Sequence, residues 1–111
     1  MIVGILPDAA TAEILLNNLA EADFSLEDVS VIMSDLGKRK AIAHDKGPLK
    51  GATLSNVADR LAQAGLSEED ARLCRNAVAQ GKVLMVMTVP PEAQKAAVEM
   101  FRDHAAEFIK E

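Results

Sequence analysis

The sequence predicts one mixed α/β (α+β) domain over residues 1–111, in which two strand-helix-strand halves form a four-stranded sheet. Three observations support this fold class. Half of the residues are hydrophobic, which is enough apolar material for a buried core. Short apolar runs of strand character alternate with amphipathic helical segments. The succession of strand, proline, acidic residue and helix occurs in residues 1–34 and again in 83–111, and a basic loop with two extra helices fills 35–82.

The first half begins with an apolar run, Ile2 to Leu6, which a proline ends, and this pattern favours a buried strand. Asp8 can cap the helix that follows. The apolar stripe of that helix comprises Ala12, Leu15, Leu16 and Leu19. In the next segment, residues 29–34, apolar residues alternate with serines. We therefore expect a strand covered on one side, with Ser30 and Ser34 on its other face.

The second half begins with the apolar run Val83 to Val89, which predicts a central strand. Two prolines end this run and begin the next helix. The predicted inward stripe of that helix comprises Ala93, Ala96, Ala97, Met100 and Phe101. Residues 107–110 contain Phe108 and Ile109 and predict a short final strand.

Two helices are expected between the halves. For the first, Ser55 is the candidate N-cap and Gly65 the C-terminal stop. For the second, Ser67 is the candidate N-cap, three acidic residues that follow it complement the helix dipole, and Gly81 closes the helix. The inner face of the second helix comprises Ala71, Cys74, Ala77 and Val78.

The composition excludes several classes of function. A net charge of −5 argues against nucleic acid and anionic membranes as partners, because both need clustered Lys and Arg. The chain has three Phe and no Trp or Tyr, so an aromatic platform for bases is not expected. The start of the sequence lacks the features of a signal peptide, and no apolar run approaches the roughly 20 residues of a membrane span. We therefore expect a cytoplasmic protein.

The basic segment from Gly37 to Gly51 is the one departure from this acidic balance, with five basic side chains against one acidic. Clustered cations and glycine amides favour an anion, which would be a small phosphate-bearing ligand or an acidic protein surface. The alternative is a solvated connecting loop. The candidate binding residues are Lys38, Arg39, Lys40, His44, Lys46 and Lys50.

Residues capable of catalysis or metal binding are few. Cys74 lies on an apolar helix face with no neighbouring His or cation to activate it, so it is interpreted as a small buried hydrophobe. His44 and His104 show no metal-ligand spacing with Cys74, and no cofactor is expected. His104 lies where a helix C-terminus favours a basic residue. An enzyme that uses Cys74 or His44 is the alternative to a protein without catalytic activity.

Four stretches carry a family resemblance: V-G-I-L at the start, S-V-I-M-S, L-x-x-A-G-L-S-E-E-D-A-R, and A-V-A-Q-G-K-V-L-M-V. They resemble the general stress protein 17M-like (YflT-type) bacterial domains over most of the chain. The resemblance implies a ferredoxin-like arrangement of the two halves and an association with stress. Residues 37–51 replace a glycine-rich apolar stretch of many relatives, which argues against a membrane role. Asp23 stands where such domains tend to have glycine, so it must adopt a positive φ or end its helix differently.

These observations predict a non-enzymatic cytoplasmic binding or protein-interaction module, whose partner is another protein or a second copy of the chain. The alternative is a sensor of a small anionic ligand, in which the basic segment folds over the ligand. Neither hypothesis involves nucleic acid or a membrane.

Overall fold

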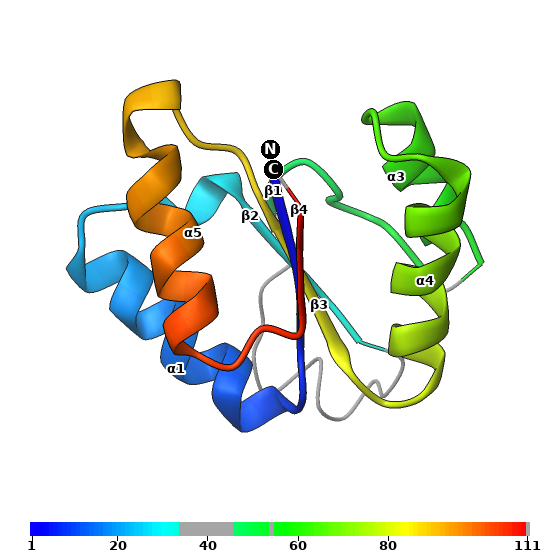
Figure 1. The fold of residues 1–111 in the computed structure, drawn as a ribbon, viewed down its shortest axis with the longest axis horizontal. Coiled ribbons are helices and arrows are strands. Elements are labelled where there is room, and N and C mark those ends of the chain that lie inside the picture. Colours follow the sequence, from blue (N-terminus) through cyan, green and yellow to red (C-terminus); the bar gives the residue numbers. More distant parts are fainter. Residues whose placement is uncertain (34–45, 54, 111) are drawn as a thin grey trace.

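The computed structural model describes residues 1–33, 46–53 and 55–110. Its elements in chain order are β1 (Ile2–Leu6), α1 (Ala9–Glu21), β2 (Val29–Ile32), α3 (Val57–Gln63), α4 (Glu68–Ala79), β3 (Val83–Met87), α5 (Gln94–Asp103) and β4 (Phe108–Lys110). Short 3₁₀ turns, η1 (Leu26–Asp28) and η2 (Pro91–Ala93), precede β2 and α5. Figure 1 shows three layers, with α1 and α5 on one face of the sheet and α3 and α4 on the other.

The four strands form one sheet in the order β2-β3-β1-β4, and all neighbouring strands are antiparallel. Strand β3 therefore lies between β1 and β2, and β1 lies between β3 and β4, which makes each half a split β-α-β unit. The predicted α+β class, with a four-stranded sheet and two helices between its second and third strands, is confirmed. The strand order could not be predicted from the sequence.

The first face of the sheet is covered by α1 and α5. The predicted α1 stripe is confirmed, since all four of its residues are buried. The predicted α5 stripe is wrong in part, because Ala96 is exposed and Val98 is buried in its place. The buried residues Ala97, Val98 and Phe101 share one side of α5, and the larger side chain of Val98, rather than the methyl group of Ala96, packs into the core.

The second face is covered by the segment between β2 and β3. Its apolar side chains pack against alternate residues of the central strands, among them Val3 and Leu84. The covering residues are Leu49, Ala52, Val57, Leu61, Ala71, Cys74, Ala77 and Val78. Every residue of β1 and β3 is buried, because the sheet has a helical layer on each side.

Ser30 corrects the prediction that β2 is covered on one side only. Its side chain is buried, its hydroxyl donates to the carbonyl of Lys46, and it accepts from the Leu49 N–H at 2.8 Å. Gly47 lies so close to β2 that a Cβ there would be 2.6 Å from the carbonyl carbon of Val29. The residues after position 45 therefore pack against β2, and the serine that the sequence placed on an exposed face anchors them.

The predicted helix ends are correct except at the starts of α3 and α5, and α5 begins at Gln94, after the 3₁₀ turn that Pro91 opens. Asp8 and Ser67 cap α1 and α4 through side-chain hydrogen bonds. Asp23 adopts a positive φ of 68°, and the next residue bonds back to Leu19 in a Schellman-type end. Ser55 does not cap α3, whose N-cap is Asn56, and the Asn56 side chain instead accepts from the Thr53 N–H.

A side chain at position 4 would not fit, because Phe101 of α5 occupies the space above Gly4. A Cβ at Gly4 would lie 2.4 Å from Cδ2 of Phe101, which is fully buried. Since β1 is held between β3 and β4, the strand cannot move away. We expect Gly4→Ala to lower the free energy of unfolding by about 1–3 kcal/mol, measured by urea denaturation.

The double variant Gly4→Ala/Phe101→Leu is the matched control for this prediction. Because leucine removes ring atoms, the double variant should lose less stability than the two single variants added together. Strict additivity, or a Gly4→Ala protein as stable as the wild type, would contradict the contact.

Candidate functional site

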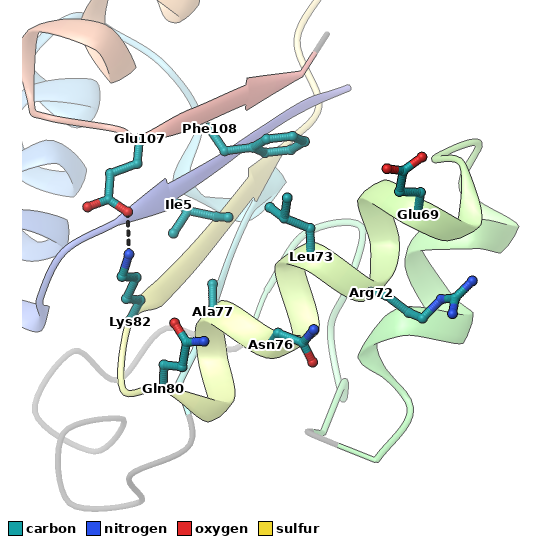
Figure 2. Close-up of a pocket in the computed structure, with 10 residues that line it drawn as sticks. All are labelled: Ile5, Glu69, Arg72, Leu73, Asn76, Ala77, Gln80, Lys82, Glu107 and Phe108. Carbon is teal, nitrogen blue, oxygen red and sulfur yellow. Dashed lines mark hydrogen bonds and ion pairs between the residues drawn. The ribbon is translucent and has the colours of Figure 1, made fainter.

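A groove runs between α4 and the β1-β4 side of the sheet, with a volume of about 660 Å³ (Figure 2). This volume lies within the usual range for binding sites. Figure 2 shows Leu73 and Ala77 pointing from α4 toward the sheet, and Phe108 reaching from β4 across Ile5. The other lining residues are Glu69, Arg72, Asn76, Gln80, Lys82 and Glu107. The groove thus has an apolar floor and a polar rim.

The groove exists because the second helical layer covers the sheet incompletely. On the first face, both α1 and α5 contact the strands. On the second face, α4 packs on β3, whereas α3 packs mainly against α4. A four-stranded sheet is about 15 Å wide between its outer strands, and one helix covers about 10 Å. Among the described residues, a strip beside α4, over β1 and β4, is therefore left open.

The exposure of Leu73 shows that this strip is open to solvent. Its exposed fraction is 45%, although it is a large aliphatic side chain on a helix that packs on the sheet. Ile14 of α1 is the other large exposed hydrophobic residue in the described part of the chain, at 54%, and it lies in the opposite layer. Leu73 differs from Ile14 because Phe108 lies beside it in the same groove.

Two ion pairs join β4 to the α4 layer. Lys82 Nζ, just after α4, lies 2.5 Å from Glu107 Oε2, just before β4. Lys110 Nζ, in β4, lies 3.3 Å from Asp70 Oδ2, in the first turn of α4. Exposed pairs of this kind contribute at most about 1 kcal/mol each. They join the start of β4 to the end of the α4 layer and the end of β4 to the first turn of α4, so β4 runs antiparallel to α4 along the groove.

The outer rim on α4 carries three polar side chains at a spacing of four residues. Arg72, Asn76 and Gln80 are exposed and therefore form one stripe along the helix. Figure 2 shows Arg72 and Asn76 on the outer side of α4, away from the floor. Within the described ranges, none of the three side chains makes a hydrogen bond or ion pair.

Of the binding residues predicted from the sequence, the two that the structure describes, Lys46 and Lys50, do not line this groove. Lys38, Arg39, Lys40 and His44 lie outside the described residues. Lys46 lies 3.8 Å from Glu27 through its ammonium group, and its carbonyl accepts from Ser30. The carbonyl of Lys50 accepts from Arg60 at 3.0 Å. The described end of the basic segment is thus held by backbone contacts to β2 and α3, and the anion site stays a prediction.

The sequence contained a signal for the groove that the prediction did not use. Leu73 is a large aliphatic residue outside the inner face of its helix, which comprises Ala71, Cys74, Ala77 and Val78. An exposed apolar residue beside others is typical of an interaction surface. Its neighbours Ile5 and Phe108 come from the two ends of the chain, so only the fold reveals that the three residues meet.

The Cys74 thiol is buried, and both ring nitrogens of His104 form hydrogen bonds. Cys74 is fully buried, and burial, together with the nearby charge of Asp70, raises the pKa of its thiol to about 11. His104 Nδ1 lies 2.6 Å from the carbonyl oxygen of Met100, and Nε2 lies 2.7 Å from Asn18 Nδ2, so the ring joins α5 to α1. Among residues 1–33, 46–53 and 55–110 there is no group of three or more potential metal ligands.

The Cys74 thiol should be unreactive in the native protein at pH 8, because burial keeps it protonated and inaccessible. We expect slow labelling by a thiol reagent, and fast labelling once urea unfolds the chain. Since the folded pKa is raised from 9.0 to about 11, the thiol stabilises the fold fully below pH 9, and this contribution is lost as the pH rises toward 11. Cys74→Ala should remove that part of the decline in urea-unfolding curves. Native labelling as fast as that of the unfolded chain would contradict this prediction.

Comparisons with known proteins leave the site to be interpreted from its geometry. The chain matches no protein-family model, no curated protein and no solved structure. The resemblance to the general stress protein 17M-like domains therefore stays a prediction. In the part of the chain that the structure describes, no helix has the length and apolar character that crossing a membrane requires.

Proposed function

We propose that this protein is a non-enzymatic cytoplasmic interaction module that binds a protein partner in the groove between α4 and β4. The observation that carries the proposal is the exposed side chain of Leu73, which lines the same groove as the half-buried Phe108. Apolar surface that leaves water contributes about 25 cal/mol per Å² to binding. A partner that covers these side chains therefore gains affinity from a surface that the fold itself leaves open.

The polar groups of the groove support binding rather than catalysis. Lys82 and Glu107 neutralise each other, and Asp70 is paired with Lys110. Cys74 is a protonated thiol on the buried face of α4, and His104 is in the opposite layer. The groups that face the groove thus offer charge and hydrogen bonds to a partner, without an activated nucleophile beside them.

The biological setting of the proposal comes from the family resemblance. Similarity to general stress protein 17M-like domains supports a role in the stress response, and the net charge of −5 supports a protein partner over nucleic acid. The partner is either another protein or a second copy of this chain. Anion binding by segment 37–51 is the alternative function. It ranks second because the described contacts of its two candidate residues are structural: the Lys46 ammonium lies near Glu27, and the carbonyls of Lys46 and Lys50 accept hydrogen bonds from Ser30 and Arg60.

The proposal predicts that Leu73→Gln weakens partner binding while Ile14→Gln does not. Both substitutions replace an exposed aliphatic residue on a helix with a neutral polar one, but they lie in opposite layers. Loss of a buried leucine contact, worth about 1.5–3 kcal/mol, should weaken binding roughly ten- to a hundredfold. The measurement is quantitative retention of cellular proteins, and of the free chain itself, on the immobilised protein.

Urea denaturation of both variants provides the control for folding. If a partner binds Leu73→Gln but no longer binds Ile14→Gln, the binding surface lies on α1 instead of the groove. Equal retention by the wild type and both variants would leave the groove without a role.

A further inference from the structure

Strand β4 follows α5 through a short, strained connection and is held by contacts with distant parts of the chain. We infer that two copies of this chain exchange β4, so that the β4 of each copy completes the sheet of the other. This inference goes beyond groove binding, because it concerns how the groove is assembled. In the exchanged dimer, each groove combines α4 of one copy with Phe108 of the other.

The connection from α5 to β4 holds a non-glycine residue in the left-handed region. Ala105 has a φ of 63°, and it stands just after the helix, where α3 and α4 have Gly65 and Gly81. A residue with a Cβ is strained in this conformation, whereas glycine is not. The Ala105 side chain is exposed, so an extended hinge relieves the strain without uncovering a buried group there. Short hinges under strain favour the exchange of the element that follows them.

The hydrogen bonds of the turn itself are long. The Ala105 N–H donates to the Arg102 carbonyl at 3.3 Å. The Ala106 N–H donates to the Phe101 carbonyl at 3.2 Å. Both distances exceed the usual value of about 2.9–3.0 Å, and water can replace such bonds at a turn near the surface. His104 stays with the helices, because its ring joins α5 to α1, so the hinge comprises Ala105 and Ala106.

The edge that receives β4 is built from residues far from it in the sequence. Strand β4 pairs with β1 along its whole length. Ion pairs join Glu107 to Lys82, after α4, and Lys110 to Asp70, in the first turn of α4. The same pairing and the same ion pairs form whichever copy supplies β4. A second copy of the chain is therefore a partner whose fit to this edge follows from the contacts of β4 itself.

Of the two edge strands in the described sheet, β4 is the one that can leave. Its three residues are half-buried or exposed, whereas all four residues of β2 are buried and Ser30 ties β2 to Leu49. Once β4 leaves, β1 becomes the edge, and its unpaired backbone groups are a template for another strand. Reciprocal exchange restores this pairing in both copies, so the assembly closes as a dimer.

Substitutions in the hinge test the exchange. The full chain is unfolded in urea and refolded at high protein concentration, and sedimentation should then show a dimer. Ala105→Pro should increase the dimer fraction, because proline fixes φ near about −65° and excludes the closed turn. Ala105→Gly should weaken the dimer roughly tenfold or more, because glycine relieves the strain that otherwise favours two open hinges.

The matched control for the hinge is Asp23→Gly. Asp23 has a φ of 68° after α1, so glycine there relieves the same kind of strain outside the hinge. Asp23→Gly should leave the dissociation constant of the dimer unchanged.

Charge reversal distinguishes an exchanged strand from an ordinary dimer. Lys82→Glu and Glu107→Lys each place like charges at the same ion pair of a single chain. When the two variants are refolded together, exchange brings opposite charges to both sites of the mixed dimer. With one variant isotopically labelled, native mass spectrometry should find mixed dimers roughly threefold or more above the statistical ratio at low salt. The excess should vanish at high salt.

Three results would overturn the inference. One is a wild-type chain that stays monomeric after concentrated refolding. Another is an equal effect of Ala105→Gly and Asp23→Gly on the dimer, which would remove the hinge from the account. The third is a statistical ratio of mixed dimers at low salt, which would identify a dimer without exchange. Leu73 lies outside the hinge, so the loss of a partner in Leu73→Gln still tests the proposed function separately.

Discussion

The structure depends on one constraint: β1 and β3 are apolar at every position and lie in the middle of the sheet, so both faces of the sheet must be shielded from water. The two split β-α-β halves supply only one helical layer, because α1 and α5 lie on the same face. The segment between β2 and β3 supplies the other. Its helices α3 and α4 are therefore part of the core rather than an appendage, and the buried hydroxyl of Ser30 fixes where this segment meets the sheet.

The same constraint explains the groove. Helix α4 covers the central strand β3, and α3 packs mainly against α4, with Val57 and Leu61 in the core of this face. The outer strand β4 is paired with β1 alone and has half-buried side chains. Two ion pairs link it to the α4 layer, and Leu73 and Phe108 stay partly open to solvent. The proposed binding site is thus the part of the second face that residues 1–33, 46–53 and 55–110 leave uncovered.

Local signals predicted the elements well, because proline stops, N-caps and apolar stripes act within a few residues. Features that depend on distant parts of the chain could not be predicted. The strand order requires knowledge of which strands pair, and the burial of Ser30 depends on the path of residues 46–53. On α5, Val98 rather than Ala96 is buried, because the side of a helix that faces the core depends on how the helix packs against the rest of the fold. The groove unites Ile5, Leu73 and Phe108 from three parts of the chain, whereas charge composition directed attention to Lys46 and Lys50, which the fold uses for other contacts.

The central claim is that α4 is an integral cover of the sheet and that β4 is its weaker edge. Native-state amide hydrogen exchange, followed by NMR on the full chain, tests this claim directly. The account predicts that amides of α4 exchange with the same free energy of opening as those of β1 and β3, equal to that of global unfolding. Amides of β4 should exchange through openings of lower free energy. Exchange of α4 at a much lower free energy than β3 would show that the sheet does not depend on its second layer, and would contradict the account.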